Sequence, residues 1–480
     1  MIWGEKRRAN TIRLNHKGKQ DMESMSFIKS TAKEICVLGL ACCIGIFGSG
    51  CGAKEEPAQE QEAKTEEALE ETAEVEAMET ENREIPILRD CVEEKMGCLA
   101  GAAVTSTEIE DEKEWEIITT HFSSVTLGNE LKPDALFNYS CSVCPGTMTD
   151  TINGQEIAVP VLDYSRAEKM LDKILEWNEA NPDKTIRVRG HVLVWHSQTP
   201  EWFFHEDYDK TKEYADKETM DLRLEWYIKT VLIHFTGEDS RYRDLFYGWD
   251  VVNEAVSDSG GYRTDSENPS EPLSDDRHGS NSSWWHIYQS EEYIINAFRY
   301  ANQYAPENLE LYYNDYNECN AVKRSSIIKL LEAVKACEGE PGEGTRISAM
   351  GMQGHYGMEN PSFSEVQSSI EAYGKIVENV QITELDISAS SDYDGSDEAK
   401  EAEYEKQRKR YKMLYFAMDA ASRKEGVNLT GITFWGTADH YSWLQNRSDV
   451  GGGSTTGLPQ CPLLFDENYE PKPCFWVFVE

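Results

Sequence analysis

The stretch "LFYGWDVVNEA" at residues 245–255 decides the fold, because an aromatic and β-branched run ends there in an Asn-Glu pair. Bulky apolar residues on both faces of a short segment are typical of a buried strand in a parallel sheet. A carboxylate has no ordinary packing role at the end of such a strand. Parallel barrel strands carry their reactive residues at their C-terminal ends, so Glu254 is a candidate catalytic residue.

Seven further candidate strands occur along the chain, with helical patterns between them. The eight predicted strands are 98–104, 123–129, 186–195, 245–254, 309–317, 347–357, 380–388 and 429–439. Apolar residues at three- and four-residue steps predict helices over 163–182, 292–306 and 323–337. Strand and helix alternating eight times predict an α/β fold of the (β/α)8 TIM barrel type.

A second carboxylate occupies an equivalent place in the pattern. In "VQITELDIS" (380–388), Glu384 is expected at the C-terminal end of the seventh strand. Glu254 and Glu384 would then face each other over the barrel mouth. Paired carboxylates on a barrel rim indicate glycoside hydrolysis, in which one acid protonates the leaving oxygen and the other attacks the anomeric carbon or activates water. The alternative for each Glu is a structural ion pair.

Length and charge limit the other possibilities. The 480 residues suffice for one large core or two ordinary domains. With 47 basic and 87 acidic residues, the net charge is −40, and a nucleic-acid partner is not expected because phosphate binding needs a basic surface. Residues 54–84 hold 13 Glu and few bulky apolar side chains. This composition predicts an acidic flexible linker over 52–84, with a fraying helix as the alternative.

The segment before this linker has the pattern of a secretory signal. "ICVLGLACCIGIFGSGC" (35–51) is too short and too rich in Gly for a comfortable membrane span. Three small residues before Cys51 resemble a bacterial lipoprotein cleavage box, although the usual Leu is missing. We therefore expect residues 1–51 to be an N-terminal extension and lipoprotein-type signal, with Met25 as a better start. The protein would be extracellular, secreted or lipid-anchored through Cys51; ordinary cleavage or a retained anchor are the alternatives.

The cysteines favour neither a disulfide framework nor a metal site. Four of the twelve lie in the targeting segment, which leaves an ordinary density over residues 85–480. "CSVC" (141–144) has the spacing of half a zinc or redox site, but no second pair follows it. No metal and no cofactor are expected. Extracellular exposure permits disulfides, but the sequence does not assign their pairs.

Six sequence blocks carry a resemblance to a known family. In order across residues 90–480 they are "RGHVLVWHSQTPEWF" (189–203), "WDVVNEA" (249–255), "YNDYN" (313–317), "QGHY" (353–356), "ITELDI" (382–387) and "GITFWGTADHYSW" (431–443). Together they resemble glycoside hydrolase family 10, the retaining endo-β-1,4-xylanases. The resemblance implies a catalytic domain over 85–480 that binds xylan and xylooligosaccharides, and we expect it to act as a monomer.

The resemblance also implies roles for the two carboxylates and their neighbours. Glu254 would be the general acid and base, and Glu384 the nucleophile that forms a covalent glycosyl-enzyme intermediate. Such a mechanism needs Glu254 to hold a proton near the working pH while Glu384 is ionised. Asn253 would bond the sugar 2-hydroxyl. His355 would hydrogen-bond Glu384 and keep it anionic.

The remaining expected sugar contacts follow from the same motifs. The substrate-binding residues implied by the resemblance are Asn129, Lys132, His191, Trp195, Asn253, Gln353, His355, Trp435 and Trp443. In the family, Trp435 and Trp443 would crowd the space of a hexose CH2OH group, which xylose lacks; capping of the barrel core is the alternative. Gly128 is a departure, because many members carry Glu there. His196 could equally be a core histidine.

Two other functions remain open at this stage. A cellulase or mannanase of the same fold would differ at Trp435 and Trp443, and a silent polysaccharide-binding lipoprotein would need the loss of a carboxylate. Both carboxylates are present. Residues 138–159, 257–283 and 388–403 exceed a minimal barrel and are predicted as loops that shape the cleft, or as neutral surface decoration.

Overall fold

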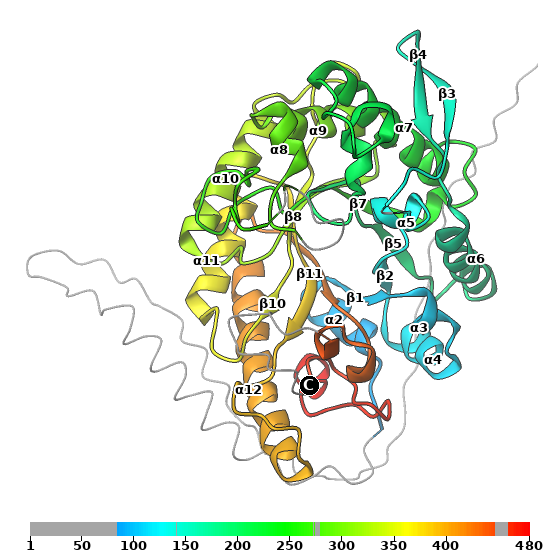
Figure 1. The fold of residues 1–480 in the computed structure, drawn as a ribbon. Coiled ribbons are helices and arrows are strands. Elements are labelled where there is room, and N and C mark those ends of the chain that lie inside the picture. The colour runs from blue at the N-terminus through cyan, green and yellow to red at the C-terminus, as the bar shows by residue number, and fades with distance from the viewer. Residues whose placement is uncertain (1–83, 141, 272, 274–278, 447–458) are drawn as a thin grey trace, which may run out of the picture. The chain divides into compact units, whose positions relative to one another are not determined.

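The computed structural model describes residues 84–480 except 141, 272, 274–278 and 447–458. Within these residues, eight parallel strands close into a barrel, since each strand pairs with the next and the last pairs with the first (Figure 1). In barrel order they are β1 (Leu99–Val104), β2 (Ser124–Leu127), β5 (Arg187–Gly190), β7 (Phe246–Asn253), β8 (Glu310–Asp315), β9 (Ala349–Met352), β11 (Asn379–Ile387) and β12 (Leu429–Phe434). The predicted (β/α)8 barrel is confirmed.

Two of the predicted strands are interrupted. The segment 186–195 divides into β5 and β6 (Val194–Trp195), and 347–357 divides into β9 and β10 (His355–Tyr356). The short strand β6 pairs with β7, with Trp195 opposite Asn253. Likewise β10 pairs with β11, with His355 opposite Asp386. These two short strands therefore bring side chains from neighbouring strands together at the C-terminal end of the barrel.

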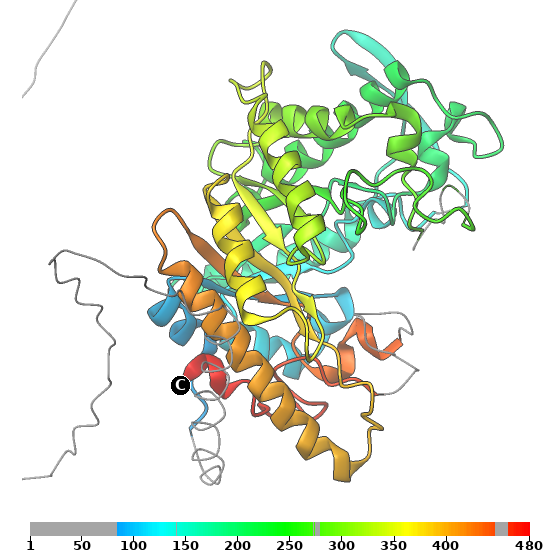
Figure 2. The ribbon, with the colours of Figure 1, turned by 90° about the vertical axis from the view of Figure 1, so that its left-hand side faces the viewer.

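Helices form the outer layer. Their bounds are α2 (Leu88–Met96), α3 (Ser106–Glu110), α4 (Glu112–His121), α5 (Pro133–Leu136), α6 (Ser165–Ala180), α7 (Lys217–Thr236), α8 (Ser283–Tyr288), α9 (Glu292–Tyr304), α10 (Ala321–Lys335), α11 (Phe363–Gly374), α12 (Asp397–Ser422) and α13 (Trp476–Val479), with 3-10 turns at Glu201–Phe204, Glu206–Tyr208, Arg243–Leu245, Asp439–Tyr441 and Trp443–Asn446. Helices α6, α9 and α10 confirm the three predicted helices. In α6 the buried stripe is Ala167, Met170, Leu171 and Ile174, the spacing expected of an amphipathic helix. Helices α11 and α12 lie side by side outside the barrel (Figure 2).

Two of the predicted loops contain regular structure, so those expectations were wrong in part. Residues 138–159 include a hairpin of β3 (Thr147–Ile152) and β4 (Gln155–Pro160), which projects at the top of Figure 1. Its turn is Asn-Gly with positive φ at both residues, the commonest two-residue hairpin turn. Residues 388–403 include the start of α12, where the Ser396 side chain caps the helix.

The core is continuous between the barrel and its helices. Trp249 of β7 is fully buried and lies against Phe235 of α7 and Phe246. A Cβ atom at Gly190 would come within 2.1 Å of the Trp249 ring, so only glycine fits at that position of β5. Close packing of β5 on β7 fixes the two strands whose ends carry His191 and Glu254.

The structure bears on the N-terminal and cysteine predictions only in part. Cys51, the predicted signal and nearly all of the predicted linker lie outside the described residues, as does Cys141 of the CSVC motif. Within the described part of the chain, no helix is long and apolar enough to cross a membrane. The seven cysteines described are all free thiols. No group of three or more His, Cys, Asp or Glu side chains among the described residues could hold a metal ion.

Candidate active site

The backbone at Glu254 turns sharply as β7 ends. Glu254 has φ of +56°, in the left-handed region that residues other than glycine seldom occupy. Its N–H donates to the Asn314 carbonyl at 2.9 Å. The next N–H, of Ala255, donates to the Tyr313 hydroxyl at 3.1 Å. Bonds to the neighbouring strand β8 therefore hold a turn that the chain would not adopt by itself.

The Glu254 carboxylate is partly exposed and is held by neutral donors. Trp195 Nε1 donates to Oε2 at 3.0 Å, and Gln353 Nε2 donates to Oε1 at 2.9 Å. The Asn253 amide lies 3.2 Å from the same Oε1. Indole and amide donors fix the position of the carboxyl group without a direct ion pair, so the group can exchange a proton with a ligand in the cleft.

Glu384 lies inside β11, which corrects the expectation that it ends a strand. The strand continues to Ile387 because β10 pairs with Asp386 and Ile387. Glu384 is buried, with 4% of its surface exposed. Asn314 Nδ2 donates to its Oε1 at 2.7 Å, and His355 Nε2 lies 3.1 Å from its Oε2. Both carboxylate oxygens are therefore fixed by side chains of other strands, Oε1 by Asn314 of β8 and Oε2 by His355 of β10.

Charge around Glu384 favours its ionised form. Burial alone would raise its pKa, but the His355 hydrogen bond, the electrostatic influence of His191 and His355 and the Asn314 amide lower the pKa to about 2. His355 in turn lies between two carboxylates, since its Nδ1 is 2.9 Å from Asp386 Oδ1. Although burial disfavours the charge on the ring, Asp386 and Glu384 raise the pKa of His355 to about 10. The ring is therefore an imidazolium that donates from both nitrogens.

Two amide side chains connect the carboxylates. Asn314 Nδ2 also donates to Asn253 Oδ1 at 3.0 Å, and Gln353 Nε2 donates to the same oxygen at 3.2 Å. Glu254 and Glu384 are thus joined through Asn253 and Asn314, and the structure brings together the two residues that the sequence predicted. Asn314 was not assigned a role from the sequence, although the YNDYN block at a strand end was the signal that could have found it.

The predicted polar sugar contacts of the β2 end also lie together. Lys132 Nζ donates to Asn129 Oδ1 at 3.2 Å and to Gln198 Oε1 at 3.0 Å. It lies 5.2 Å from the centre of a Trp195 ring. Burial lowers the pKa of Lys132, while Glu384 and other carboxylates oppose that effect. Gln198 is a further polar group of this cluster that the sequence reading did not single out.

His191 is supported from below by a buried ion pair. Its Nδ1 lies 2.8 Å from Asp250 Oδ2, and Asp250 also pairs with Arg189. Asp250 and Arg189 are both fully buried inside the barrel. This arrangement fixes the orientation of His191 and leaves its other ring nitrogen for a ligand. The sequence reading missed Asp250 and Arg189 because their role depends on contacts between strands.

The two tryptophans beyond β12 lie over the histidines and are partly exposed. Trp435 lies 5.6 Å from the His191 ring and 6.1 Å from the His355 ring, measured between centroids. Trp443 lies 4.9 Å from His355 and donates from Nε1 to Asp386 Oδ2 at 2.7 Å. Their position beside His355 and Asp386 favours a roof over the site rather than a cap on the barrel core.

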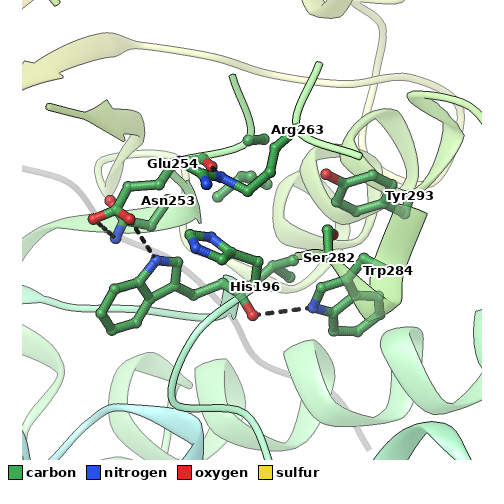
Figure 3. Close-up of a pocket in the computed structure, with 11 residues that line it drawn as sticks. His196, Asn253, Glu254, Arg263, Ser282, Trp284 and Tyr293 are labelled. Atoms are coloured by element: carbon green, nitrogen blue, oxygen red, sulfur yellow. Dashed lines mark hydrogen bonds between the residues drawn. The ribbon is translucent and has the colours of Figure 1, made fainter. Parts of the chain in front are cut away.

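A small pocket lies behind Glu254, and His196 occupies its centre (Figure 3). The His196 ring lies between Glu254 on one side and Trp284 and Tyr293 on the other. Burial lowers the pKa of His196 well below its ordinary value. Among the described residues, its Nδ1 has no hydrogen-bond partner. His196 is therefore a neutral, buried ring that lines the pocket behind Glu254. This position does not decide between a core histidine and a functional one.

Comparisons with known proteins agree with this geometry. The profile of glycosyl hydrolase family 10 matches residues 88–480. Endo-1,4-β-xylanase B of Paenibacillus barcinonensis is 32% identical over 382 residues, which cover 79% of this chain and 94% of the relative. A putative endo-1,4-β-xylanase of Caldicellulosiruptor saccharolyticus is 34% identical over 301 residues, covering 62% of this chain and 84% of the relative.

Solved structures are similar as well. The CBM22-1 and GH10 modules of Clostridium thermocellum xylanase 10B, complexed with xylohexaose, superpose with a TM-score of 0.63 at 28% identity. That similarity covers 83% of this chain and 69% of the other chain. A GH10 structure from Paenibacillus barcinonensis gives a TM-score of 0.63 at 30% identity and covers 83% of this chain and 97% of the other.

Proposed function

Because this chain belongs to glycosyl hydrolase family 10, a retaining family of endo-1,4-β-xylanases, we propose that Glu254 is its general acid and base and Glu384 its nucleophile. One observation carries the proposal: the two carboxylates have opposite surroundings. Glu384 is buried against the His355 imidazolium, whereas Glu254 is partly exposed among neutral donors. Different protonation states for two nearby carboxyl groups are what a double displacement requires.

In the first step, the Glu384 carboxylate attacks the anomeric carbon of the xylosyl residue. Glu254 donates its proton to the glycosidic oxygen, and the aglycone leaves. Hydrogen bonds from His355 and Asn314 orient the attacking oxygens of Glu384. The product is a covalent α-xylosyl ester on Glu384.

In the second step, the Glu254 carboxylate takes a proton from a water molecule that attacks the anomeric carbon from the other face. The ester bond to Glu384 breaks, and two inversions restore the β configuration. Asn253 is held by Asn314 and Gln353, which leaves it oriented for the sugar 2-hydroxyl. A hydrogen bond there strengthens as positive charge develops on the ring.

Substrate contacts are proposed for the surrounding residues. Asn129, Lys132, His191 and Trp195 would bind the non-reducing side of the cleavage point, and Gln353 would hold the acid. The roof of Trp435 and Trp443 would exclude a sugar with an exocyclic CH2OH group. A steric clash of this kind can discriminate between sugars where the loss of a contact could not.

Sugar release tests the substrate class. The purified enzyme should release reducing sugar from xylan and little from carboxymethylcellulose or mannan. Cellulose or mannan as the better substrate would favour the cellulase or mannanase alternative. Proton NMR, read before mutarotation, should show the β anomer first; an initial α anomer would contradict a double displacement.

We also propose an organisation and a location for the whole chain. Residues 1–51 would direct export, residues 52–84 would form an acidic linker, and the domain over 85–480 would act outside the cell as a monomer. The support is the pattern of small residues before Cys51 and the glutamate content of 54–84. Labelled palmitate should enter the full chain expressed in a bacterial host, but not its Cys51→Ser variant. Equal labelling of the two would contradict lipidation at Cys51.

A further inference from the structure

Arg263 is a buried arginine of segment 257–283, only 5% exposed, that reaches back to the proposed acid. Its Nε donates to the Glu254 carbonyl at 2.8 Å. Its Nη1 donates to the Ser280 carbonyl at 3.0 Å, and its Nη2 donates to the Tyr316 hydroxyl at 3.0 Å. All three guanidinium nitrogens are therefore used, each on a different segment. A lysine could not reproduce this planar arrangement.

The two carbonyls that flank the peptide nitrogen of Ala255 are both bonded to Arg263. The side chain binds the Glu254 carbonyl, and the Arg263 backbone N–H donates to the Ala255 carbonyl at 2.8 Å. Glu254 itself has the left-handed φ of +56°. A backbone in that region persists only where its surroundings hold it. Strand β8 holds the N–H side of this turn, and Arg263 holds the carbonyl side.

Arg263 also lies close to the acid in Figure 3, above the His196 ring. Burial alone would lower the pKa of Arg263, but Tyr316 and Glu254 raise it overall. The guanidinium is therefore charged at any working pH. The segment that carries it exceeds a minimal barrel, and its hydrogen bond to Ser280 connects the two ends of that segment.

We propose that Arg263 is a positioning residue for proton transfer by Glu254. It fixes the turn at the end of β7 so that the carboxyl group points at the glycosidic oxygen, and through Ser280 it couples the described residues 279–283 to this task. The proposal rests on the proposed role of Glu254 as acid and base. It goes beyond that role, because Arg263 touches the backbone of Glu254 and not the reacting atoms.

The chain offers a matched control. Arg223 of α7 is also 5% exposed, and its Nη1 donates to the carbonyls of Phe203 and His205 at 2.7 and 2.9 Å. Both arginines are thus buried side chains that bind backbone carbonyls. Among the described residues, Arg223 bonds a different segment and forms no hydrogen bond or ion pair with Glu254. Its substitution should affect stability as much as substitution of Arg263.

Leaving-group chemistry separates positioning from stability. Xylotetraose has a poor leaving group and needs the acid in the first step. The dinitrophenolate of a 2,4-dinitrophenyl β-xylobioside leaves without protonation, so kcat/KM for this substrate does not depend on the acid. Hydrolysis of the resulting glycosyl-enzyme still needs the base. With the dinitrophenyl substrate, misplacement of Glu254 should therefore slow only the second step, and kcat and KM should fall together.

The experiment compares Arg263→Gln and Arg263→Lys with Arg223→Gln and Arg223→Lys, each normalised to active sites by the burst of dinitrophenolate. For Arg263→Gln we expect kcat/KM on xylotetraose to fall about 100-fold, the cost of a small misplacement. On the dinitrophenyl substrate, kcat/KM should stay within about threefold while kcat and KM fall together. Arg263→Lys should show the same pattern at about tenfold. For the Arg223 variants, kcat/KM per active site should change by the same factor on both substrates.

Three results would overturn the proposal. One is an equal loss on both substrates after normalisation; another is wild-type kinetics in both Arg263 variants; a third is the same leaving-group pattern in the Arg223 variants. Glu254→Ala serves as the reference for the underlying function. If Glu254→Ala lowered kcat/KM equally on both substrates, Glu254 would not be the acid and base. That result differs from one in which only the positioning role of Arg263 is contradicted.

Discussion

The two carboxylates at the barrel mouth are chemically identical, yet the protein surrounds them differently. Glu384 lies within a strand, 4% exposed, and bonds a cationic histidine and an asparagine. Glu254 lies just past a strand end, partly exposed, in a left-handed turn with indole and amide partners. One environment fixes a negative charge, and the other fixes only a direction.

The difference fits the two roles proposed for these carboxylates. A nucleophile must be ionised and aimed, so rigid strands and a permanent cation suit it. A general acid must gain and lose a proton in each turnover, so a permanent ion pair on its carboxyl group would hinder it. In this account, the structure places the cation of Arg263 on the backbone of Glu254, whereas it places the cation of His355 on the carboxylate of Glu384.

The largest effect should come from removing the fixed charge. We expect Glu384→Ala to lower kcat on xylan by roughly 10⁵-fold, because no covalent intermediate can form. The fold should survive, since His355 keeps its pair with Asp386. Melting temperature and xylan turnover measure the two effects. Turnover within tenfold of the wild type would show that Glu384 is not the nucleophile.

Removal of the acid should have a smaller and more selective effect. Glu254→Ala should lower kcat/KM on xylan by about 10³-fold, within the range of general acid catalysis. With the dinitrophenyl xylobioside, added azide should restore turnover, because azide attacks the glycosyl-enzyme without a general base. Absence of azide rescue would contradict the role of Glu254 as the general base of the second step.

Substitution of His355 should make the surroundings of Glu384 resemble those of Glu254, in which neutral groups are the donors. His355→Asn removes the cation, so burial of Glu384 is less opposed and its pKa should rise from about 2. The nucleophile is lost as pH falls through that pKa, so the acid limb of kcat/KM should move to higher pH. An acid limb at the wild-type position, in profiles from pH 3 to 8, would show that His355 does not hold Glu384 ionised.

The same pKa has a consequence for stability. Because the folded-state pKa of Glu384 is lowered, its ionised form contributes stability above about pH 4.3, and this contribution is lost as pH falls toward about 2. In His355→Asn the folded-state pKa of Glu384 should lie closer to the unfolded value, so this loss should be smaller and should be complete at a higher pH. Thermal melts of the wild type and of His355→Asn across this range measure it.

The smallest effect should come from a site outside the carboxylate pair. A Cβ atom at Gly128 would meet nothing nearer than 3.6 Å, so Gly128→Glu should fit. The added carboxylate should bond a sugar hydroxyl and lower KM on xylooligosaccharides by about threefold with kcat unchanged, the sign of uniform binding. A large change in kcat would mean that this end of the cleft also controls the chemistry.

Much of the fold could be predicted because strand and helix periodicity is local. The hairpin β3–β4 was missed, although Asn153 and Gly154 were a recognisable turn signal, because both of its strands are mostly exposed. The start of α12 was missed because its first turns are acidic and solvent-facing. Apolar patterns cannot reveal elements that bury little.

The candidate site could be predicted only as far as its motifs reach. Glu254 and Glu384 were found because a carboxylate at the end of an apolar run is anomalous. Asn314 bonds Asn253 and Glu384, which lie 61 and 70 residues away along the chain. Arg263 bonds the backbone carbonyl of Glu254, 9 residues before it. No residue-type pattern identifies such a contact. The left-handed turn at Glu254 was equally invisible, since glutamate does not favour it.

The most direct test of the central claim is to trap the intermediate. A 2-deoxy-2-fluoro-β-xylobioside with a dinitrophenyl leaving group should form the glycosyl-enzyme quickly and hydrolyse it slowly, because fluorine destabilises both transition states. Peptide mapping by mass spectrometry should then find one fluoroxylobiosyl group, attached to Glu384. An adduct on Glu254, or hydrolysis of the natural substrate with no adduct on either residue, would contradict the assignment of Glu384 as the fixed nucleophile and Glu254 as the proton carrier.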